Sequence, residues 1–167
     1  MKEIGRMILQ ETIENKILFM RGKKVMLDSE LAKLYGVPTK VLIQAVRRNI
    51  KRFPLDFTYQ LTKKEVVNLR SQFVTSSWGG RRYLPYAFTE QGVAMLSTVL
   101  NSERAIHVNI QIMRTFTKLR EMIESNKDLK RKIEEIEKKY DKQFLVVFEA
   151  IKRLIDPELK PKRKIGF

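Results

Sequence analysis

The sequence has no cysteine and a single histidine, His107, among its 167 residues. Without thiols the chain can form no disulfide, no thiolate metal site and no cysteine nucleophile, which suits a reducing compartment. Zinc sites usually combine several histidine, cysteine or carboxylate ligands, so a chain with one histidine and no cysteine lacks the ligands of most zinc sites. Since the sequence also lacks a nucleophile–base pair and a Gly-rich phosphate loop, we expect no metal, no cofactor and no enzymatic activity.

Long apolar runs are missing too. No segment approaches the roughly 20 apolar residues of a membrane-spanning helix. The N-terminal stretch MKEIGRMILQETIENK mixes acidic residues into its apolar positions, unlike a signal peptide. Hydrophobic residues nevertheless make up 43% of the chain, which is enough for a buried core. We therefore expect a folded cytoplasmic protein with no membrane partner.

Acidic residues are scarce in one part of the chain. The net charge is +15, and residues 38–82 alone hold ten Lys or Arg against two Asp or Glu, a net of +8. No acidic residue lies between Glu30 and Asp56. A cationic excess concentrated in this way predicts a polyanionic partner.

The stretch DSELAKLYGVPTKVLIQAVRRNIKRF, residues 28–53, predicts two helices joined by a short turn. Asp28 is expected to cap the first helix and Gly36 to end it in the left-handed conformation. Pro38 suits the first turn of the second helix, which we expect to run from about residue 38 to Phe53. This arrangement is typical of a helix-turn-helix, whose second helix enters the DNA major groove. A plain α-hairpin would share the spacing, so the decision rests on the polar face of the second helix.

The second helix is expected to bury one stripe of side chains and expose another. The buried stripe contains Leu42, Val46, Asn49, Ile50 and Phe53, and the opposite side carries Lys40, Gln44, Arg47 and Lys51, with Thr39, Arg48 and Arg52 beside them. Arg and Gln match guanine and adenine edges, while Lys suits phosphates. Ile43 falls within the polar stripe, where it could meet a thymine methyl group. A merely solvated face is the alternative, but such a face normally interleaves acidic residues.

Further strands and helices are expected on either side of this unit. Residues 16–27 predict a hairpin that turns at Arg21–Gly22, and residues 56–61 predict a strand. Thr62 and Glu65 form a capping box before a short helix that carries Lys63 and Lys64, which we count among the DNA-binding residues. Residues 74–88 predict a second hairpin with Arg81 and Arg82 at its tip. It is either a wing that grips DNA or an ordinary solvated turn.

Two scaffold helices follow. Thr89 is the expected cap of the first, and Asn101 or Ser102 is the expected cap of the second. Ile106 and Ile110 are among the residues expected to fill the core from the second helix. His107 is expected to be a surface or packing residue rather than a metal ligand.

Five runs together resemble a known family. They are LDSELAKLYGVPTK, AVRRNIKRFPLDFTYQLT, LRSQF, GGRRYLPYAFTEQGVAMLS and AIHVNIQIMRTF. Residues 13–122 are similar to the phage ORF-six-type N-terminal domain, a relative of the KilA-N and Bro-N domains. The resemblance implies DNA binding without catalysis, in a regulator of phage, prophage or mobile-element origin that is often an antirepressor. It would act at the nucleoid of a bacterial host cell.

The last part of the chain changes character. Residues 124–155 are rich in charge, with apolar residues at heptad-like steps: Leu129, Ile133, Ile136, Tyr140, Phe144, Val147, Ile151 and Leu154. We expect one long helix that dimerises as a coiled coil, in preference to folding back on its own domain. Residues 156–167 are expected to be a basic, flexible tail.

The sequence therefore predicts an α+β fold, with a helix-turn-helix and small wing-like hairpins in residues 13–123 and a dimerising helix in residues 124–155. The expected partner is double-stranded DNA, read in a sequence-specific manner for transcriptional control. The expected contacts are Thr39, Lys40, Ile43, Gln44, Arg47, Arg48, Lys51, Arg52, Lys63, Lys64, Arg81 and Arg82. The alternative is an adaptor that binds another regulator through its C-terminal helix, with an incidental basic patch. RNA binding comes third, and repression and antirepression both remain open.

Overall fold

The computed structural model of the chain describes residues 9–72, 84–139 and 145–155. Its elements, in order, are β1 (Leu18–Met20), β2 (Lys23–Leu27), α2 (Asp28–Tyr35), α3 (Thr39–Arg48), the 3₁₀ turn η1 (Ile50–Arg52), β3 (Thr58–Gln60), α4 (Lys63–Gln72), β4 (Tyr86–Thr89), α5 (Glu90–Leu96), α6 (Glu103–Glu124), α7 (Lys127–Lys139), β5 (Leu145–Val146) and α8 (Val147–Ile155). This confirms the α+β class. The expected wing tip, with Arg81 and Arg82, and the expected tail at 156–167 lie outside the described residues.

The strands form one antiparallel sheet in the order β3-β4-β2-β1-β5. The predicted first hairpin is confirmed, since β1 and β2 pair and the turn between them consists of Arg21 (φ 51°) and Gly22 (φ 72°). Two successive residues with positive φ match the right-handed twist of a two-residue hairpin. The segment predicted as a strand at 56–61 supplies β3, which pairs with β4.

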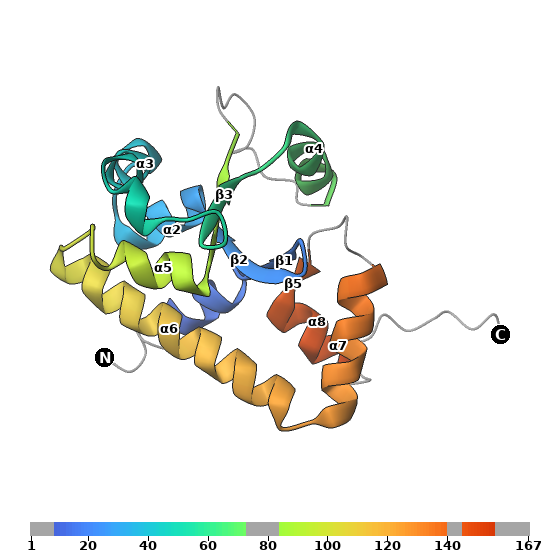
Figure 1. Cartoon of the computed structure of the whole chain (residues 1–167). Helices are drawn as coiled ribbons and strands as arrows, with labels where there is room; N and C mark the ends of the chain where they lie inside the picture. The colour runs from blue at the N-terminus through green and yellow to red at the C-terminus, as the bar shows by residue number, and fades with distance from the viewer. Residues whose placement is uncertain (1–8, 73–83, 140–144, 156–167) are drawn as a thin grey trace.

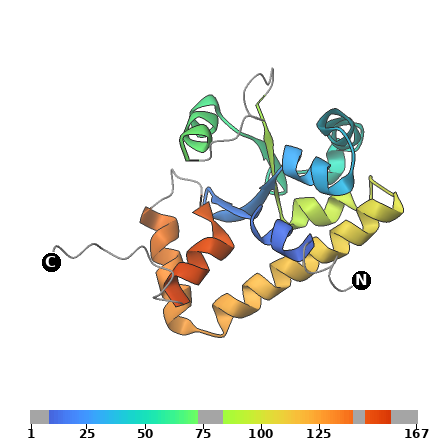
Figure 2. The ribbon, with the colours of Figure 1, turned by 180° about the vertical axis from the view of Figure 1, so that it is seen from behind.

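Both faces of the sheet are buried because alternate side chains point to opposite sides. Phe19, Met26 and Phe88 belong to the larger core, which the helices other than α4 cover. Leu18, Val25, Leu27 and Ala87 are among the residues of a smaller core on the other face, where Leu69 of α4 closes it. Figure 1 shows α4 set apart from the other helices, and Figure 2 shows the same arrangement from behind.

Helix ends follow local capping chemistry. Thr62 and Glu65 form the predicted capping box, because each backbone N–H donates to the other side chain, at 2.8 and 3.2 Å. Thr89 caps α5 as predicted, and Ser102, one of the two candidates for α6, caps that helix. The prediction for Asp28 is wrong by one position, since Leu27 occupies the N-cap and Asp28 begins the helix. The buried Asp28 carboxylate instead accepts the N–H of Ser29 at 2.7 Å and that of Tyr86 in β4 at 3.1 Å.

The C-terminal segment is not one long helix, and this expectation is wrong. Helix α7 begins at Lys127, after the Asn126 side chain accepts two N–H groups of its first turn. Strand β5 (Leu145–Val146), which pairs with β1, then separates α7 from α8 inside the range expected to be one helix. Leu129, Ile133 and Ile151 of the expected heptad seam are buried in the same core as α6. These apolar side chains find partners within one chain, so a dimer could use this seam only after α7 and α8 separate from α6. Whether the chain dimerises stays a prediction.

Helix α6 departs from expectation on its outer side. Figure 1 shows it running along the molecule from the α3 side to α7. Its inner face is buried at Val108, Ile112 and Phe116, among others. Ile106 and Ile110 were expected in the core, but they remain 45% and 44% exposed. The reason is geometric, because α6 lies at the edge of the molecule and only one of its sides faces the core.

Candidate nucleic-acid interface

The turn between α2 and α3 is fixed by backbone hydrogen bonds. Gly36 has φ 72° and ψ 32°, and its N–H donates to the carbonyl of Lys33, while the N–H of Val37 donates to that of Ala32. This pair of bonds is the Schellman pattern, which needs a left-handed residue and therefore favours glycine. Pro38 then precedes α3, and its carbonyl accepts the N–H groups of Val41 and Leu42. The predicted helix-turn-helix geometry is confirmed at this turn.

Arg104 of α6 holds the same turn from outside. Its Nε donates to the carbonyl of Leu34 at 3.1 Å, which satisfies one of the free carbonyls at the end of α2. A Cβ on Gly36 would lie only 2.9 Å from this Nε, so a larger residue at this position would displace the Arg104 side chain. The sequence pattern gave no signal for this contact, because 70 residues separate Arg104 from Leu34.

Helix α3 packs through fewer residues than predicted, and not all of the same ones. Leu42, Ile43 and Val46 are buried. Ile43 is only 7% exposed, so its expected place on the DNA-facing stripe is wrong, whereas Ile50, expected in the core, is 60% exposed. The α-helix ends at Arg48 and continues as a 3₁₀ turn, which changes the rotation per residue and directs Ile50 outward. Phe53 is buried as predicted and packs edge-on against Phe88, with the two ring centres 6.3 Å apart.

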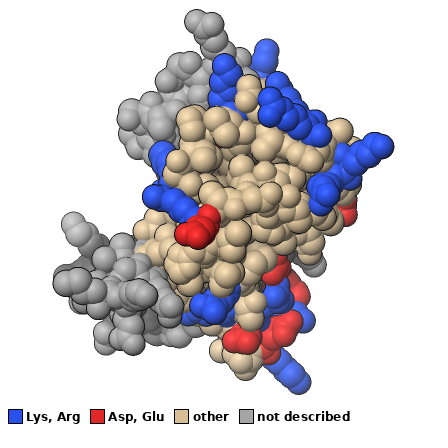
Figure 3. Space-filling model, turned by 90° about the vertical axis from the view of Figure 1, so that its left-hand side faces the viewer, with Lys and Arg blue, Asp and Glu red and all other residues tan. Residues whose placement is uncertain are grey.

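The outer face of α3 and η1 is cationic. Its exposed polar side chains are Lys40, Gln44, Arg47, Arg48, Lys51 and Arg52, and Thr39 at the helix start is half-buried. Within the part of the chain that the structure describes, none of these cations forms an ion pair. Figure 3 views the molecule from the side on which α3 lies, and Lys and Arg occupy the upper edge of that view without acidic neighbours. We call the exposed side chains of residues 40–52 the α3 face.

Lys63 and Lys64 lie at the exposed start of α4 rather than on the α3 face. In Figures 1 and 2, α3 and α4 stand on opposite sides of β3, at the same end of the molecule. The structure therefore brings together the predicted contacts of α3 and η1, apart from Ile43, and places the two lysines of α4 separately.

The position of α4 is set by an ion pair with the first hairpin. The Arg21 guanidinium donates to both carboxylate oxygens of Glu65, at 2.6 and 3.0 Å, and lies 4.2 Å from the centre of the Tyr59 ring. Partial burial raises the pKa of Glu65, but the hydrogen bonds from Arg21 and Thr62 outweigh it, so its pKa is lowered overall. The hydrogen bond to Glu65 raises the pKa of Arg21, and burial raises that of Tyr59 to about 12. The start of α4 is thus fixed by a bidentate, charge-assisted contact.

The chain matches the sequence pattern of one known domain family. The sequence pattern of the ORF6N domain matches residues 15–99, which is just over half of the chain. The chain belongs to the ORF6N domain family. The matched range covers the first hairpin, the helix-turn-helix and α4, and it confirms the resemblance found in the sequence. Neither the curated proteins nor the solved structures contain a significant match to the chain.

The described ranges of this ORF6N protein contain neither a metal-binding cluster nor a membrane-spanning helix. Residues 9–72, 84–139 and 145–155 contain no group of three or more His, Cys, Asp or Glu side chains that could hold a metal ion. In the same ranges no helix has the length and apolar character needed to cross a membrane. The exposed cations of the α3 face make it the candidate site of this protein.

Proposed function

We propose that this ORF6N protein is a regulator of phage or mobile-element origin that binds double-stranded DNA in a sequence-specific manner and controls transcription. It would act in the cytoplasm, at the host nucleoid. The observation that carries the proposal is the α3 face, where cations that have no acidic partner among the described residues lie on the second helix of a helix-turn-helix. Cations that are not held in ion pairs are available to phosphates. Membership of a phage-type regulatory family supports the same conclusion.

Within the α3 face we assign two roles. Gln44 and Arg47 lie one turn apart near the middle of the exposed side, so they suit base edges, where Arg pairs with guanine and Gln with adenine. Lys40, Lys51 and Arg52 lie toward its ends and suit phosphates, which fix the position of the helix in the groove. Lys63 and Lys64 of α4 would add phosphate contacts outside the groove.

Ile50 takes over the role first expected of Ile43. It is 60% exposed between Asn49 and Lys51, directly after the basic end of α3. An apolar side chain among cations is poorly placed for water but well placed for the methyl group of a thymine in the major groove. We therefore include Ile50 in the proposed reading surface and exclude Ile43.

The proposal includes no catalysis. An adaptor that binds another regulator is the second candidate function, and the exposed apolar side of α6 favours it over an enzyme. DNA binding and an adaptor role make opposite predictions for salt, because only the former releases condensed counterions from a polyanion.

The test measures binding to a duplex selected from a random pool and to an unselected duplex, by fluorescence anisotropy at several salt concentrations. If four or five phosphates are contacted, the logarithm of the association constant should fall with the logarithm of salt with a slope of about −4. The selected duplex should bind at least ~1,000-fold more tightly than the unselected one. A slope near zero, or equal binding of both duplexes, contradicts sequence-specific DNA binding.

A further inference from the structure

Two side chains of α6 hold the end of α2. The Nε of Arg104 donates to the carbonyl of Leu34 at 3.1 Å. The hydroxyl of Tyr35 donates to the Oδ1 of Asn109, also at 3.1 Å. Leu34 and Tyr35 are the last two residues of α2, so both bonds act where the turn of the helix-turn-helix begins. We call this pair of contacts the α6 clamp.

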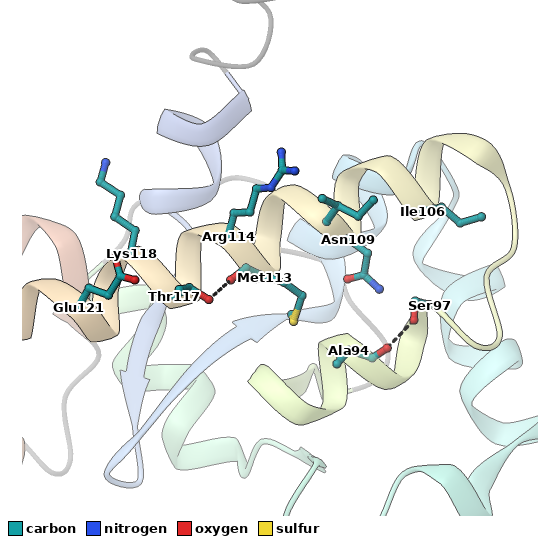
Figure 4. A pocket seen from close by; sticks show the side chains of 10 residues that line it. Ala94, Ser97, Ile106, Asn109, Met113, Arg114, Thr117, Lys118 and Glu121 are labelled. Atoms are coloured by element: carbon teal, nitrogen blue, oxygen red, sulfur yellow. Dashed lines mark hydrogen bonds between the residues drawn. The ribbon is translucent and has the colours of Figure 1, made fainter. Parts of the chain in front are cut away.

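The Asn109 half of the α6 clamp is buried and permits one arrangement of its groups. Asn109 and Tyr35 are 4% and 2% exposed. The amide nitrogen of Asn109 donates to the carbonyl of Val93 in α5 at 3.1 Å, and Figure 4 shows this side chain directed toward α5. Because a carbonyl can only accept, the amide nitrogen must face Val93, and the amide oxygen then accepts from the Tyr35 hydroxyl. A buried network of this kind favours one relative placement of α2, α5 and α6.

The placement of α2 determines that of α3. Helix α3 packs against α2 across the turn, and Leu42 of α3 lies in the same core as Leu31 of α2. The other side of α3 carries Gln44 and Arg47, the residues proposed to read base edges. A bidentate contact with a base depends on the distance and direction of each donor, whereas a phosphate contact is less demanding. A shift of α2 should therefore reduce base reading more than it reduces phosphate binding.

We propose that Arg104 and Asn109 are positioning residues for DNA recognition, which set the placement of α3 in the groove through α2 and do not touch DNA themselves. The inference rests on the proposed function and deepens it. Both residues belong to α6, which begins at Glu103, after the range 15–99 that matches the ORF6N pattern. The specificity of this chain thus depends on residues outside its matched domain.

The ratio of the affinities for the selected and unselected duplexes is the readout that a merely stabilising role would not change. Arg104→Ala should lower affinity for the selected duplex by at least ~10-fold and for the unselected duplex by less than ~3-fold, with the salt slope unchanged. Tyr35→Phe, which removes the hydroxyl of the α6 clamp, should lower the ratio by at least ~3-fold. Arg114→Ala is the matched control, because Arg114 is an exposed arginine of the same helix that points away from α5 in Figure 4, and it should leave the ratio unchanged. Circular dichroism of every variant must match the wild-type spectrum at the assay temperature.

The reading residues supply a test of how the α6 clamp acts. In a chain that already carries Gln44→Ala and Arg47→Ala, adding Arg104→Ala should lower affinity for the selected duplex by less than ~3-fold, because the contacts that it misplaces are gone. A loss equal to that in the wild-type background overturns the proposal. So does an Arg104→Ala chain that binds both duplexes more weakly by the same factor and has a salt slope flatter by about one unit, since Arg104 would then be a phosphate contact.

Hydrogen exchange of the DNA-free chain separates this inference from the proposed function. The N–H groups of Gly36 and Val37 donate to carbonyls of α2. Their exchange rates should rise by at least ~10-fold in Arg104→Ala and stay unchanged in Arg114→Ala, because only the former loosens the end of α2. Unchanged rates in Arg104→Ala overturn the inference, however tightly the chain binds DNA. If the rates rise as expected but the wild-type chain binds both duplexes equally, it is the proposed function that fails, and the positioning role falls with it.

Discussion

The outer faces of α3 and α6 differ in chemistry, although both helices bury their inner faces in one core. The α3 face presents cations that have no acidic partner in the described part of the chain, whereas the outer side of α6 presents Ile106 and Ile110, which are 45% and 44% exposed. The first surface suits a polyanion, whose binding weakens with salt, and the second suits an apolar partner, whose binding does not. Packing of the inner face thus decides where each helix lies, and the chemistry of the outer face decides what the helix can bind.

The strongest test of this contrast is Arg47→Ala. A bidentate contact to guanine contributes about 1 to 3 kcal/mol of discrimination, so affinity for the selected duplex should fall by about 5- to 150-fold. Affinity for the unselected duplex should fall much less, because one phosphate contact is replaceable. Ile110→Glu, on the exposed side of α6, should leave the affinity for both duplexes unchanged. Equal losses on both duplexes would remove Arg47 from the reading surface.

The second test breaks the turn that positions the α3 face. Gly36→Ala forces a side chain into the left-handed region and against Arg104, so it should cost about 2 kcal/mol of unfolding free energy. Gly22→Ala is the matched control, because Gly22 has the same φ of 72° but nothing within 4 Å of an added Cβ, and it should cost about 1 kcal/mol. Urea unfolding measures both. Equal costs would mean that Arg104 moves aside freely.

The third test concerns the ion pair that positions α4. The pKa of Glu65 is lowered in the folded state, so its contribution to stability is present above its unfolded pKa and is lost as pH falls through the lower, folded pKa. Glu65→Gln should therefore destabilise the chain by about 1 kcal/mol at pH 7, and by progressively less as pH falls below about 4. Glu134→Gln, on the exposed side of α7, is the matched control and should change the unfolding free energy little at pH 7. A destabilisation by Glu65→Gln that is constant with pH would exclude the ionised pair as its cause.

Local signals in the sequence predicted much of this molecule, and long-range ones did not. The Thr62–Glu65 capping box, the Gly36 turn and the Arg21–Gly22 hairpin each depend on residues a few positions apart, and all three are present. The contact of Arg104 with Leu34 joins segments 70 residues apart, and no periodic pattern encodes it.

Apolar periodicity also failed in instructive ways. The heptad-like spacing after Ile123 correctly marked a buried stripe at Leu129 and Ile133. It could not tell whether the partner is a second chain or the same one, because both bury the same surface. Ile50 turned outward because the change from α-helix to 3₁₀ turn at Asn49 alters the period on which its assignment depended. Ile43 is buried within the regular helix, three residues before Val46 and on the same face.

The smallest expected effect tests whether the α3 face has an apolar component. Ile50→Ala should weaken binding to the selected duplex by about 0.5 to 1 kcal/mol, the order expected for burial of one or two methyl groups. The salt slope should not change, since no counterion is released.

Replacing thymines of the selected site by uracil removes the methyl groups one at a time. At the thymine that Ile50 contacts, the uracil substitution and Ile50→Ala should each weaken binding, and the two together should weaken it no further. Val67→Ala provides an exposed aliphatic control on α4 and should have no effect with either base. If the two losses add at every thymine, Ile50 makes no methyl contact, and the α3 face reads DNA through its polar side chains alone.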